Sequence, residues 1–299
     1  MNSIKDLHLE FIKNIMVYSD KFKLLDFKTN DTRIFGLLFF EPSTRTCLSF
    51  ESAIHKIGGK VLKLDYNSSS KNKGESDYDT IKTIEKYVDV LIIRHPEKGF
   101  INECLKFIKK PIINAGDGDG EHPTQALLDL YTINNFYDLF QDKPFKIGLA
   151  GDIRYSRTIH SLVYLLNKIN KNIEFTFISI PQLLPQKGDE FYNYINNNCK
   201  NNICYSYSMN DVKNQLNQLD VLYMTRIQKE RMDFTFQNNH QILILSEDLI
   251  KNTKDNLIIM HPLPRNDEIP ETLDNNPKCK YFDQVENGVY VRMAILHLI

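Results

Sequence analysis

The residues best suited to chemistry lie in the stretch 39–46, which reads Phe-Phe-Glu-Pro-Ser-Thr-Arg-Thr. Ser43 or Thr44 is expected to cap a helix, which would place Arg45 and Thr46 in its first turn, where backbone amides have no partner within the helix. A phosphate could bind there, because four features meet at the start of the helix: amide N–H groups, the positive end of the helix dipole, hydroxyls and a guanidinium. An ordinary capped helix with a solvated arginine is the alternative that this stretch alone leaves open.

The elements on either side must position these groups. The apolar run 34–40 predicts a buried parallel strand. Periodic apolar residues between Leu48 and Ile57, followed by two glycines, predict a helix with a glycine stop. Pro42 fits a tight turn between the two. The sequence therefore predicts a strand, a turn and a helix, with the phosphate-binding groups at the turn.

Other polar side chains lie at or just beyond the ends of apolar runs that predict strands. They are Arg94, His122, Arg157, Arg226 and the stretch His-Pro-Leu-Pro-Arg at 261–265. In parallel sheets with helices on both faces, ligands bind beyond the carboxyl ends of the strands. Together with Arg45, arginines then follow strands in both halves of the chain. This favours an anion site in a cleft between two domains over a set of unrelated solvated arginines.

Strands that alternate with helices over the whole chain predict an α/β fold with two doubly wound parallel-sheet domains. The length of 299 residues also suggests two domains, and the polar break 134–144 is their expected boundary. The final segment, 285–299, predicts a last helix, with its periodic apolar residues after Asn287-Gly288. We expect one domain of residues 1–132 and 285–299, a second of residues 133–284, and the active site in the cleft between them.

Composition argues against several functional classes. The formal net charge of −1 provides no global attraction for nucleic acid or an anionic membrane, and no apolar stretch has the length of a membrane span. The N-terminus lacks the apolar core of a secretory signal, and five cysteines without a CxxC pair fit a reducing compartment, so we expect a cytoplasmic protein.

No metal-ligand cluster or cofactor motif is apparent, so we expect neither a metal nor a cofactor. Glycines 116, 118 and 120 do not have the GxGxxG spacing, and no Walker lysine follows them. They are expected to allow a tight turn that brings His122 and Gln125 to the end of a strand.

Arginines combined with hydroxyls suit phosphate and carboxylate groups that are held in a fixed orientation. A serine nucleophile is not indicated, because Ser43 has no GxSxG setting. The set fits group transfer between two anionic substrates, in which the enzyme positions both and stabilises developing charge.

Four motifs, in order along the chain, resemble the aspartate/ornithine carbamoyltransferase family. They are the stretch 39–46, Arg-His-Pro at 94–96, His-Pro-Thr-Gln at 122–125 and His-Pro-Leu-Pro at 261–264. Segments 155–161 and 224–231 are similar to those of the aspartate branch, whereas ornithine enzymes have a cysteine in the segment where this chain has Leu263. The resemblance implies transfer of the carbamoyl group of carbamoyl phosphate to the α-amine of L-aspartate, in pyrimidine biosynthesis.

The resemblance also implies roles for single residues. The phosphate of carbamoyl phosphate would bind Ser43, Thr44, Arg45 and Thr46. The carbamoyl oxygen would accept hydrogen bonds from Thr46, Arg94 and His122. The carbamoyl amide would contact Gln125 and the backbone carbonyls of Leu263 and Pro264. L-aspartate would bind Lys73, Arg157, Arg226 and Gln228. The catalytic group would be Arg45, Thr46, Arg94 and His122.

The family further implies a homotrimer, in which Ser69 and Lys73 reach the site of an adjacent subunit. From the residues alone, Lys73 would be a solvated loop charge. Ion pairs between the two domains are implied for Glu41, Arg157 and Arg231. The sequence leaves open whether a regulatory chain or a larger complex binds.

One position departs from the family pattern, because Cys47 stands where a second arginine is usual. Two other functions compete with the implied one. A catalytically silent scaffold is disfavoured because all the implied site residues are present. Transfer to a cationic acceptor such as ornithine is disfavoured because Arg157 and Arg226 would repel it.

Overall fold

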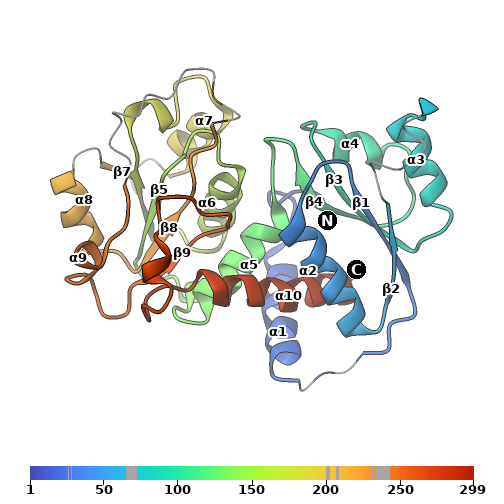
Figure 1. Cartoon of the computed structure of the whole chain (residues 1–299), viewed down its shortest axis with the longest axis horizontal. Coiled ribbons are helices and arrows are strands. Elements are labelled where there is room, and N and C mark those ends of the chain that lie inside the picture. Colours follow the sequence, from blue (N-terminus) through green and yellow to red (C-terminus); the bar gives the residue numbers. More distant parts are fainter. Residues whose placement is uncertain are drawn as a thin grey trace. The chain divides into compact units, whose positions relative to one another are not determined.

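The computed structural model describes residues 1–25, 27, 29–64, 73–199, 203–206, 209–229, 232 and 243–299. Its elements are drawn in Figure 1. The chain divides into two compact units, of which unit 1 comprises Met1–Tyr131 and Glu286–Ile299, and unit 2 comprises Thr132–Val285.

Unit 1 is built on a four-stranded sheet in the order β2-β1-β3-β4, in which every described pair of neighbours is parallel. Its strands are β1 (Ile34–Phe39), β2 (Lys60–Lys63), β3 (Val90–His95) and β4 (Ile112–Asp117). Its helices are α1 (Leu9–Lys23), α2 (Thr44–Ile57), α3 (Asp77–Ile84), α4 (Phe100–Leu105), α5 (Pro123–Asn134) and α10 (Tyr281–Leu298). The boundaries of unit 1 fall inside α5 and α10.

The core of unit 1 shows the two-sided burial that a parallel sheet requires. Leu38, Leu91 and Ile93 pack with side chains of α3 and α4 on one face. Leu37 and Ile92 alternate with them along the strands and are also fully buried. Helices therefore cover both faces.

Unit 2 is built on a five-stranded sheet in the order β7-β6-β5-β8-β9, again with parallel neighbours among the described residues. Its strands are β5 (Phe145–Ala150), β6 (Ile173–Ile178), β7 (Ile203–Ser206), β8 (Val221–Met224) and β9 (Ile258–Met260). Its α-helices are α6 (Arg157–Ile169), α7 (Glu190–Asn198), α8 (Met209–Leu216) and α9 (Glu247–Ile250). Short 3₁₀ turns are η3 (Leu139–Gln141), η4 (Pro181–Leu183) and η7 (Glu271–Leu273). The predicted α/β class with two parallel sheets is confirmed.

The strand, turn and helix predicted around residues 34–58 are confirmed as β1 and α2. Gly58 ends α2 with a φ of 93°, the left-handed conformation that favours glycine. Pro123 is the first residue of α5, as predicted.

The predicted start of the last helix is wrong. Helix α10 begins at Tyr281 and continues through Asn287-Gly288. A Cβ atom on Gly288 would lie 2.7 Å from Nη1 of Arg292 and 3.1 Å from Leu128. The glycine therefore provides room for close packing inside the helix and does not mark a helix start.

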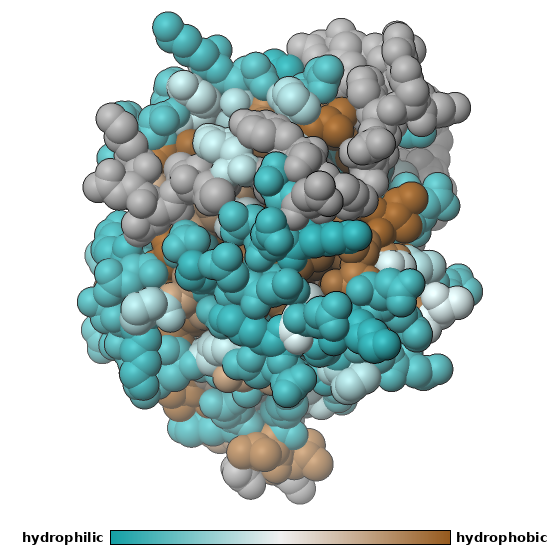
Figure 2. Space-filling model, turned by 90° about the vertical axis from the view of Figure 1, so that its left-hand side faces the viewer, coloured by the Kyte–Doolittle hydropathy of each residue, from teal (hydrophilic) through white to brown (hydrophobic). Residues whose placement is uncertain are grey.

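The surface drawn in Figure 2 is mainly hydrophilic, and the hydrophobic side chains visible there lie in separate groups among the described residues. Within the part of the chain that the structure describes, no helix combines the length and apolar character needed to cross a membrane.

Candidate active site

The first turn of α2 carries the predicted phosphate-binding residues. Ser43 occupies the N-cap position in an extended conformation, but its side chain makes no capping hydrogen bond. Thr44 and Arg45 are exposed at the start of the helix, whereas Thr46 is buried. The hydroxyl of Ser43 is therefore not used to satisfy the helix amides, in contrast to the capping role expected from the sequence.

Arg94 lies beside this turn because β3 is the neighbour of β1. Phe39 at the end of β1 is in register with Arg94. The guanidinium Nη2 of Arg94 lies 2.6 Å from Oε1 of Glu41, and its Nη1 donates to the carbonyl of Ala115 at 3.4 Å. The side chain of Arg94 is only 12% exposed. Glu41 thus holds a largely buried guanidinium near the start of α2.

His122 and Gln125 follow a tight turn after β4, as predicted. Gly116 and Gly118 have φ values of 138° and 53°, and a Cβ on Gly118 would lie 2.5 Å from the carbonyl oxygen of Pro96. The turn therefore requires glycine at position 118. The carbonyl of the buried His122 accepts from the amide of Gln125 at 3.0 Å and so starts α5. The order β1-β3-β4 brings the three turns to one edge of the sheet.

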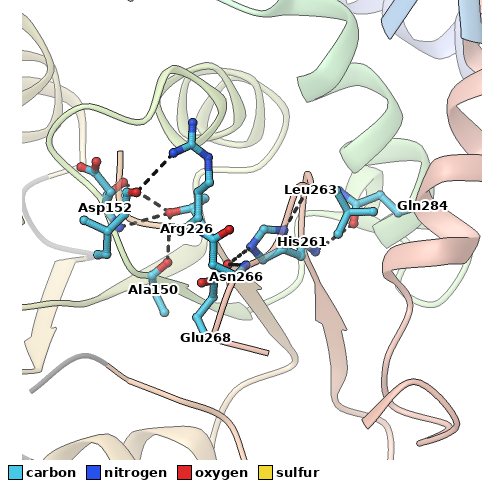
Figure 3. A network of polar contacts seen from close by, with 10 residues as sticks. Ala150, Asp152, Arg226, His261, Leu263, Asn266, Glu268 and Gln284 are labelled. Carbon is cyan, nitrogen blue, oxygen red and sulfur yellow. Dashed lines mark hydrogen bonds and ion pairs between the residues drawn. The ribbon is translucent and has the colours of Figure 1, made fainter. Parts of the chain in front are cut away.

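A buried carboxylate, Asp152, organises the end of the sheet in unit 2. Its Oδ1 accepts from the amide of Tyr155 at 2.9 Å, and its Oδ2 accepts from the amide of Gln228 at 3.1 Å. Its own amide donates to Oγ1 of Thr225 at 3.2 Å. Figure 3 shows Asp152 and Arg226 in this polar network. Asp152 therefore ties together the two segments that carry the predicted aspartate-binding residues.

Arg157 and Arg226 reach this region from different elements. Arg157 is the first residue of α6 and is buried. Arg226 follows β8 and is half-buried, and its Nη1 donates to the carbonyl of Ile227 at 3.3 Å. Strands β5 and β8 are neighbours, with Ala150 opposite Met224. Adjacent strand ends thus carry both arginines in unit 2.

The turn after β9 is fixed by His261 and Glu268, which are both buried (Figure 3). Nδ1 of His261 accepts from the amide of Leu263 at 2.8 Å, so Nε2 carries the proton and donates to Oε1 of Glu268 at 2.9 Å. Leu263 has a φ of 54°, a strained conformation for a branched residue, and its bond to Pro264 is cis. The imidazole therefore stabilises the turn that presents the carbonyls of residues 263 and 264.

Electrostatics reinforce this pair. Burial acts to raise the pKa of Glu268, but hydrogen bonds from His261 and from the amide of Asn266 favour the carboxylate and hold its pKa below the usual value. Glu268 is therefore an ionised acceptor at neutral pH.

The remaining predictions concern three positions. Lys73 is exposed. Ser69 and Arg231 lie outside the described residues. Among the residues that are described, no group of three or more His, Cys, Asp or Glu side chains could hold a metal ion.

Cys47 is buried in α2, and burial raises the pKa of its thiol, while the nearby Lys63 acts to lower it. Lys63 also pairs with Glu51, at 3.1 Å. A small thiol beside a lysine thus occupies the position where the resemblance implies a second arginine.

Two domain families of known proteins match almost the entire chain. Residues 1–135 match the domain described as aspartate/ornithine carbamoyltransferase, carbamoyl-P binding domain, and residues 143–299 match the aspartate/ornithine carbamoyltransferase, Asp/Orn binding domain. The chain belongs to the aspartate/ornithine carbamoyltransferase family. The predicted resemblance is confirmed.

Relatives within this family are close in sequence. The aspartate carbamoyltransferase catalytic subunit of Picrophilus torridus is 45% identical over 278 residues, which cover 91% of this chain and 86% of the relative. That of Thermoplasma acidophilum is 40% identical over 311 residues, covering 99% and 96%.

Solved carbamoyltransferase structures share the fold. Aspartate transcarbamoylase from Trypanosoma cruzi in complex with carbamoyl aspartate and phosphate is 34% identical, with a TM-score of 0.88, and the match covers 99% of this chain and 94% of that chain. The same enzyme in complex with carbamoyl phosphate is 33% identical, with a TM-score of 0.89 and the same coverage.

Two buried residues of this family member, Asp152 and Glu268, were not predicted from the sequence. Asp152 follows an apolar run that predicts a strand, as the arginines do, so its position could have identified it. Glu268 lies in an ordinary polar stretch, and only its contact with His261 distinguishes it.

Proposed function

We propose that this chain transfers the carbamoyl group of carbamoyl phosphate to the α-amine of L-aspartate, giving N-carbamoyl-L-aspartate and phosphate for pyrimidine biosynthesis. The observation that carries the proposal is the set of cationic and hydroxyl side chains at the strand ends of each unit. The similarity to an aspartate transcarbamoylase in complex with carbamoyl aspartate and phosphate supports it.

In this proposal, unit 1 binds carbamoyl phosphate. Ser43, Thr44, Arg45 and Thr46 bind the phosphate with the start of α2, where the helix dipole favours an anion. The carbonyl oxygen of the substrate accepts from Thr46, Arg94 and His122. Support comes from the neighbouring turns after β1, β3 and β4, which carry these residues. Arg94 can donate to the substrate while its Nη2 stays paired with Glu41, because a guanidinium has five N–H donors.

Unit 2 binds L-aspartate. Two carboxylates need two cationic partners, and Arg157 and Arg226 supply them, with Gln228 as a further donor. Support comes from Asp152, which fixes the backbone of Tyr155 and Gln228 and so limits the freedom of both segments. The carbonyls of Leu263 and Pro264, with Gln125, accept from the carbamoyl amide.

The neutral α-amine of aspartate then attacks the carbamoyl carbon. Negative charge gathers on the carbonyl oxygen, where Thr46, Arg94 and His122 stabilise it. The bond to phosphate breaks, and the phosphate leaves with the amine proton. Holding both reactants in place can contribute about 7–11 kcal/mol to lowering the barrier.

The direct test supplies carbamoyl phosphate with L-aspartate or L-ornithine and measures the ureido product. Formation from aspartate and not from ornithine is the expected result. Product from ornithine, or from neither acceptor, would refute the proposal, and the second outcome would favour a silent scaffold.

We further propose a cytoplasmic homotrimer with shared sites, in which Ser69 and Lys73 act in an adjacent subunit. Inactive Lys73→Ala and Arg45→Ala proteins would be dissociated, mixed and reassembled. Mixed trimers should regain activity, because some sites then combine an unaltered Arg45 from one subunit with an unaltered Lys73 from its neighbour. Proven subunit exchange without regained activity would exclude shared sites.

A further inference from the structure

Arg292 is a buried arginine of α10 for which the proposed mechanism has no use. It is only 3% exposed. Its Nη1 donates to Oγ of Ser49 in α2 at 3.0 Å and to the carbonyl of Gly288 at 3.1 Å, and its Nη2 donates to Oγ1 of Thr124 in α5 at 3.4 Å. Its Nε is buried without a hydrogen-bond partner. These neutral oxygens do not balance the charge of a buried guanidinium.

The carboxylate charge that acts on this guanidinium is that of Asp129, a fully buried residue of α5. Burial lowers the pKa of Arg292 to about 10, and the negative charge of Asp129 acts in the opposite direction. Two opposite charges in a water-poor environment each favour the ionised form of the other. Arg292 and Asp129 thus carry charges of opposite sign that act on each other inside unit 1.

Asp129 in turn holds the side chain of Gln125. Its Oδ1 accepts from Nε2 of Gln125 at 2.8 Å. An ionised carboxylate can only accept hydrogen bonds, so the end of the carboxamide that faces it must be the NH₂ group. The oxygen of Gln125 consequently points away from Asp129. A neutral partner at position 129 would not fix this orientation, because it could face either end of the carboxamide.

We propose that Asp129, supported by Arg292, is a positioning residue that makes Gln125 a hydrogen-bond acceptor for the NH₂ group of the carbamoyl substrate. This inference rests on the proposed function, in which Gln125 contacts the carbamoyl amide. It adds a basis for specificity, since a carbamoyl NH₂ donates to an acceptor and the methyl group of an acyl phosphate does not.

The test measures binding of two stable phosphonates by calorimetry. Phosphonoacetamide carries the NH₂ group, and 2-oxopropylphosphonate has a methyl group in its place. The unaltered protein should bind the amide about fivefold to tenfold more tightly, which corresponds to one hydrogen bond. Asp129→Asn should lose this preference and keep its affinity for inorganic phosphate, which needs only the start of α2.

Three further variants make the result specific. Arg292→Met should lose the amide preference like Asp129→Asn, whereas Arg292→Lys retains the positive charge and should keep most of the preference. If Arg292→Met does not fold, the nearly isosteric Asp129→Asn still decides. Asp20→Asn is the matched control. Asp20 of α1 also accepts a hydrogen bond from α5, from the hydroxyl of Tyr131, but it does not contact Gln125.

The inference is overturned if Asp129→Asn keeps the full preference for the amide. It is also overturned if the affinities for the amide and for inorganic phosphate fall together, since that result indicates a merely structural role. Absence of any preference in the unaltered protein would refute it as well. Failure of the proposed function is a separate result, in which the protein binds the amide selectively but forms no N-carbamoyl-L-aspartate.

Discussion

Replacing Arg94 by alanine should lower kcat by about 10²–10³ and leave the fold intact. Removal of one donor to a developing oxyanion costs about 2.7–4 kcal/mol of transition-state stabilisation. Arg94 is only 12% exposed, so water cannot readily replace its guanidinium. The loss should appear mainly in kcat, because the charge on the carbonyl oxygen is largest in the transition state.

The same substitution removes the partner of Glu41. The side chain of Glu41 is 22% exposed, so the remaining carboxylate can regain part of its hydration. We expect a loss of about 1–2 kcal/mol in the free energy of unfolding, a small part of the roughly 5–15 kcal/mol typical of a domain.

Steady-state kinetics with saturating carbamoyl phosphate and aspartate, together with urea denaturation, separate the two effects. Arg33→Ala is the matched control, because Arg33 also lies in unit 1 and forms an ion pair with Asp31 at 2.6 Å, at 31% exposure of its side chain. Its kcat should stay near that of the unaltered protein. A kcat within tenfold of normal for Arg94→Ala would refute the proposed role of the guanidinium.

Three other predictions follow from buried contacts. Asp152→Asn leaves one good acceptor for the amides of Tyr155 and Gln228, so the KM for aspartate should rise about tenfold, which corresponds to the loss of one hydrogen bond to a charged group. An unchanged KM would show that the hydrogen bond from Gln228 to Asp152 is unimportant for aspartate binding. The pKa of Glu268 is lowered in the folded protein, so its ionised form stabilises the fold above its ordinary pKa near 4.3, and this stabilisation is lost as the pH falls through the pKa of the folded protein. Between pH 3 and 6, the denaturation midpoint should therefore depend less on pH in Glu268→Gln than in the unaltered protein. The same pH dependence in both proteins would contradict the pairing of Glu268 with His261. Gly288→Ala should lower the free energy of unfolding by about 1–3 kcal/mol, because the added Cβ would lie 2.7 Å from Nη1 of Arg292. A higher midpoint of thermal denaturation in this variant would contradict the packing.

The local pattern of the sequence was sufficient to predict the helices and strands around the site and the type of ligand that it binds. A strand, a turn and a helix around residue 43, a glycine stop at position 58 and a helix start at Pro123 depend on neighbouring residues, so the sequence contains them directly. The same holds for the arginines at strand ends, which predicted anionic ligands. The motifs at these positions were enough to predict the family.

Contacts between distant residues could be known only from the tertiary structure. The amide of Gln228 meets Asp152 from 76 positions away because β5 and β8 are neighbours in the sheet, and strand order is not encoded by any single stretch. The pairing of Glu41 with Arg94 likewise depends on the register of β1 and β3. Gly288 was misread as a helix boundary because its reason, the space taken by a buried guanidinium, exists only once α10 is packed. Residue types thus determined which groups were available, and the register and packing of distant elements decided which of them meet.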